Sequence, residues 1–155
     1  MVFTGTYTNP VVKKQEILAS TDESMHGFME KMMELIILNP ENTIEECVQR
    51  SLEHLGIGEE LSREEFHRLV CGFMPVETYA KAYYRDKIMR TIVESGISIY
   101  VYGDGWENFD LCERENFHRE MGNTYLVLKA VVNAKISLNI MPWFKAGFQE
   151  KIATA

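Results

Sequence analysis

The sequence predicts an α/β fold in which helices cover a parallel β-sheet. Two runs rich in β-forming residues, Val2–Tyr7 and Ile97–Tyr102, are each bounded by turn residues. Residues 20–71 between them have helical periodicity and are longer than one crossover between parallel strands needs. A third run, Ile136–Ile140, follows a helical segment, and this alternation is typical of βαβ units with right-handed crossovers. We therefore expect one domain over residues 1–155, with residues 20–71 inserted in it as a helical cap.

The composition indicates an acidic globular protein. The chain has 155 residues, a formal net charge of −7 and a pI near 5.1, which argues against nucleic acid or an anionic membrane as the main partner. Its three cysteines, Cys47, Cys71 and Cys112, are widely spaced and form no CxxC pair, so we expect neither a disulfide framework nor a zinc site. No apolar run is long enough to span a bilayer and no signal peptide is recognisable. We expect a cytoplasmic protein with no transmembrane segment.

The first strand and the first helix of the predicted cap have clear boundaries. The strand Val2–Tyr7 ends in the turn sequence Thr8-Asn9-Pro10. Ser20–Asp22 supplies helix-start residues, and Asn39-Pro40 ends the helix that follows. Apolar residues recur along this helix at the spacing of one face, which favours core packing over a partner groove. They are Met25, Phe28, Met29, Met32, Met33 and Ile36.

Three further helices follow, each with a recognisable cap. One runs from about Thr43 to Leu55, and Gly56 stands where a left-handed C-terminal glycine belongs. Ser62–Glu65 is a capping-box pattern at the start of the next. Pro75 opens the third, which closes at Ser95-Gly96.

The second half of the chain changes to strand periodicity. Ile97–Tyr102 is an almost continuous run of β-formers, as expected for a strand covered on both faces. Residues 107–123 are polar and fit either a short strand or only a loop. A helix starts at Thr124, the strand Ile136–Ile140 comes next, and a helix that begins at Phe148 has barely one turn before the last residue. We therefore expect the chain to end inside a fold.

Two glycine-containing loops follow predicted strands, at the carboxyl edge where α/β sheets bind ligands. Gly5-Thr6 follows the first strand, and Gly103-Asp104-Gly105-Trp106 follows the second. The glycines would let the backbone approach a ligand, and Trp106 could stack on a base or sugar. The alternative is a sharp turn with Trp106 packed beneath it, and for Gly5-Thr6 a simple strand end.

A third loop, Trp143–Phe148, precedes the last predicted helix. A diphosphate at the amino end of that helix would gain from free backbone N–H groups, from the helix dipole and from Lys145 or Lys151, with Gly147 allowing close approach. The alternative is an aromatic loop that covers the core. The four histidines show no metal-ligand spacing, so no metal site is expected, and His118 is interpreted as a solvated surface residue.

Three blocks of the sequence resemble the C-terminal half of group 1-type glycosyltransferases, most closely the spore-maturation-protein-like branch with a GT-B fold. They are Val2–Tyr7, Arg90–Trp106 with its Tyr-Gly-x-Gly-Trp end, and Ala134–Ile140 continued through Gln149–Ile152. The resemblance implies a Rossmann-like domain that binds a UDP- or GDP-type nucleotide sugar without a metal or other cofactor. The topology of that family implies that Val2–Tyr7 is the central strand, with Ile97–Tyr102 and Ile136–Ile140 as buried, parallel strands on either side. It implies that Gly5, Thr6, Gly103, Gly105, Trp106, Lys145, Gly147 and Lys151 line the nucleotide-sugar site.

The chain departs from this family where many relatives carry two glutamates that hold the donor. Ala146 and Thr154 stand at those positions, and Lys151 replaces an arginine. Two alternatives therefore stay open: a non-catalytic sugar- or nucleotide-binding module, and a helical protein-interaction domain. Because GT-B chemistry occurs between two domains and this chain covers most of one, we expect no turnover from the isolated chain, and homodimerisation through its last helix.

Overall fold

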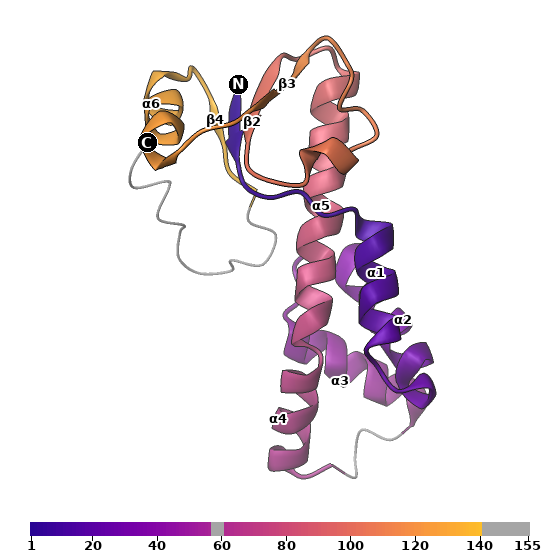
Figure 1. The fold of residues 1–155 in the computed structure, drawn as a ribbon. Coiled ribbons are helices and arrows are strands. Elements are labelled where there is room, and N and C mark those ends of the chain that lie inside the picture. The colour runs from indigo at the N-terminus through magenta and orange to yellow at the C-terminus, as the bar shows by residue number, and fades with distance from the viewer. Residues whose placement is uncertain (57–60, 141–155) are drawn as a thin grey trace. The chain divides into compact units, whose positions relative to one another are not determined.

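The computed structural model describes residues 1–56 and 61–140 and divides the chain into two compact units (Figure 1). The α/β unit consists of Met1–Asn9 and the chain from Ala82 onward. The helical unit is Pro10–Lys81. The predicted cap over residues 20–71 lies inside this second unit, which extends ten residues further at each end.

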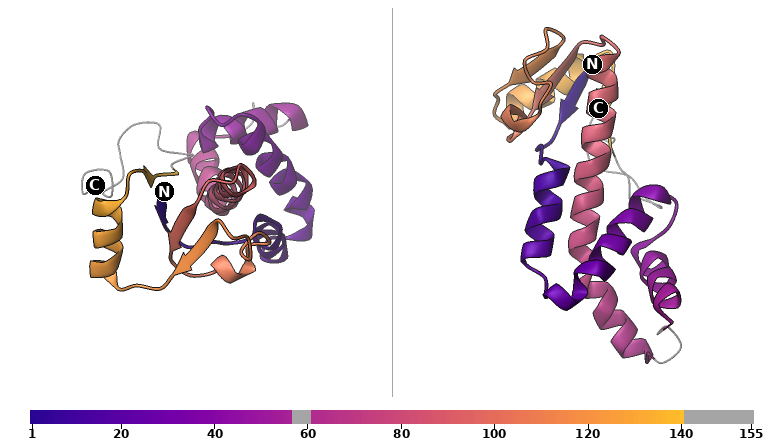
Figure 2. Two further views of the ribbon diagram at one scale, coloured as in Figure 1. Left: turned by 90° about the horizontal axis from the view of Figure 1, so that it is seen from above. Right: turned by 90° about the vertical axis from the view of Figure 1, so that its right-hand side faces the viewer.

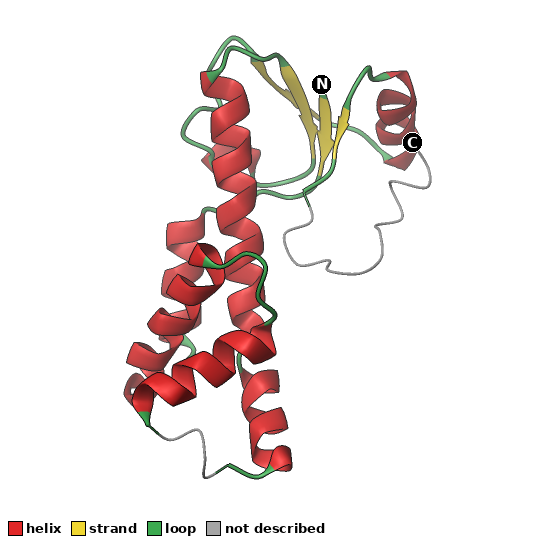
Figure 3. Cartoon of the chain, turned by 180° about the vertical axis from the view of Figure 1, so that it is seen from behind, coloured by secondary structure: helices red, strands yellow, loops and turns green. Residues whose placement is uncertain are grey.

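The α/β unit contains a four-stranded sheet with all strands parallel (Figure 3). Its strands are β1 (Val2–Thr4), β2 (Ile99–Tyr102), β3 (Phe117–Glu120) and β4 (Ser137–Leu138), in the order β3-β2-β1-β4. The prediction that the first strand is central, with parallel partners on either side, is confirmed. This order is compatible with a Rossmann-like sheet, in which successive strands are placed on one side of the first strand and the chain then crosses to its other side. Of the two interpretations of residues 107–123, the short strand is correct.

Helices lie on opposite sides of this sheet. The part of α5 (Met74–Glu94) from Ala82 onward covers one face, and α6 (Thr124–Asn133) lies on the other (Figures 1 and 2). The main core lies on the α5 side, where aromatic and branched side chains from strands, loops and helix interlock. Its buried members are Phe3, Tyr7, Met89, Val93, Ile99, Val101, Trp106, Phe109, Phe117 and Ile140.

The face toward α6 is only partly covered, which corrects the expectation that β2 is covered on both faces. Along β2 burial alternates: Ile99 and Val101 are buried, whereas Tyr100 is 42% exposed. Tyr100 stacks on His118 of the neighbouring strand, with ring centroids 4.5 Å apart, so His118 is half-buried rather than solvated. The strand predicted over 136–140 is also shorter, because only Ser137–Leu138 pair with β1 and neither residue is buried.

The helical unit contains α1 (Pro10–Ala19), η1 (Glu23–Met25), α2 (His26–Leu38), α3 (Ile44–Leu55), α4 (Arg63–Gly72) and the start of α5. The predicted capping box at Ser62 is present, and Gly56 has the predicted left-handed conformation with φ of 71°. Met29, Met32 and Met33 are buried, so the interpretation of this face as core is confirmed. The sequence analysis missed α1, because Pro10 was interpreted as the end of a turn, although proline also suits the first position of a helix.

No helix among the described residues combines the length and apolar character that crossing a membrane requires.

Candidate ligand site at the carboxyl edge of the sheet

The loops after β1 and β2 run side by side beyond the carboxyl ends of their strands. The Gly5 N–H donates to the Tyr102 carbonyl at 2.8 Å, and the Tyr7 N–H donates to the Asp104 carbonyl at 2.8 Å. The structure therefore brings Gly5-Thr6 and Gly103–Trp106 together at the edge where parallel sheets bind ligands. The other predicted site residues, Lys145, Gly147 and Lys151, lie outside the described residues.

The two glycines after β2 allow these loops to approach each other. Gly103 has φ of 135°, and a Cβ there would lie 2.6 Å from the Gly5 carbonyl oxygen. Gly105 has φ of 83°, and its Cβ would overlap the Tyr7 carbonyl oxygen. Only glycine combines these backbone angles with this lack of space. Both glycines therefore serve the contact between loops, which is a different role from the predicted approach to a ligand.

Trp106 belongs to the core rather than to an open stacking surface. Its side chain is almost fully enclosed, with 1% of the residue exposed. The indole Nε1–H donates to the Gly5 carbonyl at 2.8 Å, and the ring stacks on Tyr7 with centroids 5.1 Å apart. Of the two interpretations of Trp106, the structure matches packing beneath the turn, and this packing ties the two loops together.

A cleft of about 460 Å³ opens at the carboxyl ends of β2 and β3. It is lined by Gly103, Asp104, Gly105, Trp106, Glu107, Arg119, Glu120 and Met121. Three of these residues are acidic and one is basic, and Arg119 also lies 3.5 Å from Glu113. Carboxylates accept hydrogen bonds from hydroxyl groups and repel phosphates. The cleft alone therefore suits the hydroxyl-bearing part of a ligand better than its charged part.

A second cation at this edge, besides Arg119 of the cleft, is Arg85 of α5, which the sequence analysis missed. Its Nη1 donates to the Thr6 carbonyl, and its Cζ lies 5.5 Å from the centroid of the Phe3 ring. Within the described part of the chain, no carboxylate forms an ion pair with Arg85, and its Nε is buried without a hydrogen-bond partner. Burial lowers the pKa of this guanidinium from its ordinary value. A desolvated cation with an unused donor is suited to bind an anion.

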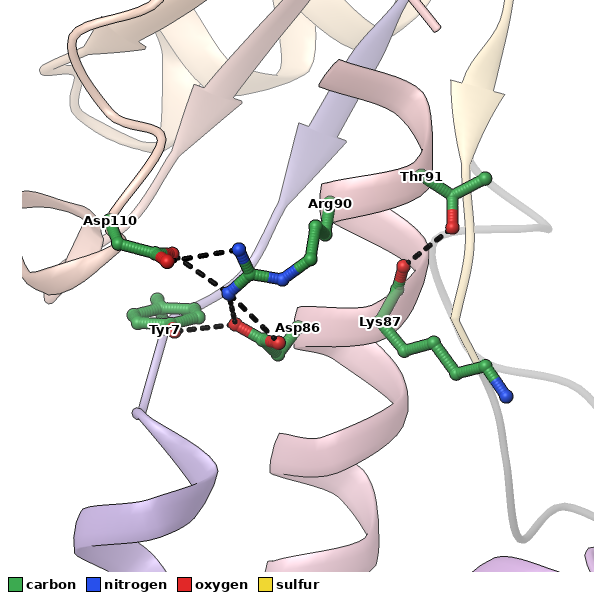
Figure 4. A network of polar contacts seen from close by, with 6 residues as sticks. All are labelled: Tyr7, Asp86, Lys87, Arg90, Thr91 and Asp110. Atoms are coloured by element: carbon green, nitrogen blue, oxygen red, sulfur yellow. Dashed lines mark hydrogen bonds and ion pairs between the residues drawn. The ribbon is translucent and has the colours of Figure 1, made fainter. Parts of the chain in front are cut away.

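A neighbouring arginine on the same helix shows the opposite arrangement (Figure 4). Arg90 donates to both oxygens of Asp110, at 2.8 and 2.9 Å, and to Asp86 at 3.4 Å. The bond to Arg90 lowers the pKa of Asp110. Asp86 also accepts from the Tyr7 hydroxyl at 2.7 Å, and burial followed by this bond raises the pKa of Tyr7. Arg90 therefore forms ion pairs with two carboxylates, whereas no carboxylate among residues 1–56 and 61–140 pairs with Arg85.

A second buried polar atom without a partner lies at the same edge. Asn139 directly follows β4, and its Oδ1 has no hydrogen-bond partner in the part of the chain that the structure describes. Buried polar atoms are normally satisfied, so the Arg85 Nε beside the loop after β1 and the Asn139 Oδ1 after the adjacent β4 are consistent with a polar ligand. No sequence signal separates Arg85 from Arg90 in advance, because the difference depends on which of them the carboxylates contact.

The described residues contain no group of three or more His, Cys, Asp or Glu side chains that could hold a metal ion. In comparisons with known proteins, no family model, no curated protein and no solved structure matches this chain.

Proposed function

We propose that the α/β unit is the nucleotide-sugar-binding part of a glycosyltransferase, which transfers a sugar from a nucleoside diphosphate sugar to an acceptor. The observation that carries the proposal is Arg85, an arginine beside the Gly5-Thr6 loop to which the described residues supply no counter-ion. It supplies a positive charge at the carboxyl edge of a parallel sheet, where nucleotides bind in many α/β proteins. The resemblance of Val2–Tyr7, Arg90–Trp106 and Ala134–Ile152 to GT-B donor domains supports the same conclusion.

The two ends of such a ligand match the two parts of the site. The diphosphate binds Arg85, which offers charge-assisted hydrogen bonds in place of its missing ion pair. Ribose or sugar hydroxyls donate to the carboxylates of the cleft, among them Asp104 and Glu120. A ligand with phosphates alone would meet the repulsion of the acidic cleft, and an uncharged sugar would leave Arg85 unpaired. A nucleotide sugar satisfies both parts.

The second candidate is a module that binds the same ligand without transferring its sugar. It is favoured by Ala146 and Thr154, which stand where many of the resembled enzymes carry donor-binding glutamates. The two candidates share the binding site and differ in whether transfer occurs in the presence of an acceptor domain.

The experiment is isothermal titration of the whole chain with UDP, GDP, uridine and guanosine. We expect one nucleoside diphosphate to bind more tightly than its nucleoside, and Arg85→Gln to weaken that diphosphate about 10- to 100-fold, which corresponds to roughly 1.5–3 kcal/mol for a hydrogen bond to a charged group. Arg68→Ala, at an exposed position of α4, is the control and should leave binding unchanged. The proposal is wrong if no nucleotide binds, or if Arg85→Gln binds UDP and GDP as the unmodified chain does.

A further inference from the structure

Two neighbouring residues of α5 hold two neighbouring residues of the loop after β1. Arg85 donates to the Thr6 carbonyl, and Asp86 accepts from the Tyr7 hydroxyl at 2.7 Å. We call these four residues the loop clamp. In the first contact the helix residue is the donor, and in the second the helix residue is the acceptor. Together the two contacts fix the position of the loop along α5 and its orientation relative to α5.

The peptide bond between Thr6 and Tyr7 lies at the centre of the loop clamp. Its C=O accepts from Arg85, and its N–H donates to the Asp104 carbonyl at 2.8 Å. These two groups point in opposite directions in a trans peptide, and the described residues contain no cis peptide bond. The peptide is therefore held from both sides, by Arg85 and by the loop after β2. A shift of this peptide would move the Thr6 carbonyl, the hydrogen-bond acceptor that Arg85 contacts.

The Tyr7–Asp86 contact is itself rigidly placed. The Tyr7 ring is buried and packs against Trp106 and Phe109, with centroids 5.1 and 5.3 Å away. The Asp86 side chain is 15% exposed and takes a second, longer contact of 3.4 Å from Arg90 (Figure 4). Asp86 is thus a fixed point on α5, one residue from Arg85.

We propose that Tyr7 and Asp86 are positioning residues that hold the Arg85 guanidinium in its anion-binding orientation before any ligand arrives. The inference rests on the proposed function for the identity of the anion, a nucleoside diphosphate. An arginine that is ordered by the fold loses less side-chain entropy when it binds, so the clamp strengthens binding without contacting the ligand.

The first test measures Arg85 in the free protein. NMR of the arginine Nε–Hε groups, with the Arg85 signal assigned from Arg85→Lys, should give an ordered Arg85 side chain in the unmodified chain. Tyr7→Phe keeps the ring and removes only the hydroxyl, and it should make the Arg85 Nε–Hε signal mobile on the picosecond-to-nanosecond timescale. Tyr125→Phe on the exposed surface of α6 is the matched control and should change nothing. An equally ordered Arg85 in Tyr7→Phe overturns the positioning role, whatever the protein binds.

The second test uses the ligand. Tyr7→Phe should weaken the nucleoside diphosphate roughly three- to tenfold, the cost of ordering one long side chain, and should leave the corresponding nucleoside unchanged. A variant that is merely less well folded would lose affinity for both. If Arg85→Gln loses the phosphate-dependent affinity and Tyr7→Phe retains it, the clamp proposal fails and the proposed function stands. If the unmodified chain binds no diphosphate while Tyr7→Phe mobilises Arg85, the proposed function fails and the positioning role stands.

Discussion

Replacing Gly103 by alanine tests the close contact between the loops after β1 and β2. Gly103 has φ of 135°, a backbone conformation that side chains with a Cβ rarely adopt. The new Cβ would also lie 2.6 Å from the Gly5 carbonyl oxygen and 2.8 Å from its carbon. Because that carbonyl accepts the Trp106 Nε1–H bond, its displacement would disturb the aromatic core as well.

The size of the effect follows from two costs. The strained backbone costs about 1–3 kcal/mol. An ordinary contact begins at 3.4 Å, so the Gly5 carbonyl must retreat by about 0.8 Å, and overpacking of this kind typically costs about 1–3 kcal/mol more. We expect Gly103→Ala to lower the free energy of unfolding of the α/β unit by about 3 kcal/mol, which corresponds to roughly 12–24 °C in melting temperature for a unit of this size.

Tryptophan fluorescence can follow this unit separately. The chain has two tryptophans, so a Trp143→Phe background leaves Trp106 as the reporter, buried in the core of the α/β unit. The matched control is Gly27→Ala, at an exposed position of α2 where a Cβ would meet nothing within 4 Å. It should stabilise the helical unit by up to about 1 kcal/mol. If Gly103→Ala has the same melting temperature as the otherwise identical chain that keeps Gly103, the loop-contact argument is refuted.

Three further predictions concern stability. Thr43→Ala removes the hydroxyl that accepts the Glu46 N–H at 3.2 Å in the capping box of α3, so urea unfolding should report a loss of about 1 kcal/mol, and an unchanged midpoint would contradict it. Met32 is 0% exposed and Met121 is 98% exposed. Met32→Ala should therefore lower the free energy of unfolding by about 2–5 kcal/mol and Met121→Ala by under about 0.5 kcal/mol, and equal losses would contradict the assigned core. Burial, and then the bond to Asp86, raise the pKa of Tyr7 above its ordinary 10.0, so the unfolded chain releases this proton first and stability falls as the pH rises above 10. The melting temperature of the unmodified chain should therefore fall toward that of Tyr7→Phe as the pH rises above 10, and a constant difference in this range would exclude this linkage.

Features with local causes could be predicted from the sequence. Ser62 and Gly56 were identified because a capping box and a left-handed C-cap depend on residues within one turn of the helix. The parallel direction of the strands followed from the alternation of helix and strand, since parallel neighbours need long crossovers, whereas the central place of β1 was expected from the resemblance to a known topology. The convergence of Gly5 and Gly103 then followed from topology alone.

The missed features depend on which partner each side chain finds. Pro10 fits both a turn and a helix start, so α1 could not be separated from a loop. Tyr100 lies in an almost uniformly β-forming run, and its exposure arises because α6 covers little of that face. Arg85 differs from Arg90 only through the carboxylates around it, and those come from Asp86 and the distant Asp110.

The central position of β1 has a consequence for the order in which the protein folds during synthesis. Its residues leave the ribosome well before those of its neighbour β2, which begins at Ile99, and β1 pairs with β2 through Val2 and Tyr100. At about 5–20 residues per second, β1 waits roughly 5–20 s for that partner and longer for β4. The helices of Pro10–Lys81 follow one another along the chain and can form during this interval, because contacts between successive helices close short loops at low entropic cost. Until then the apolar Val2-Phe3 segment lacks both strands that it pairs with in the folded sheet, which leaves it open to capture by a chaperone or by another strand.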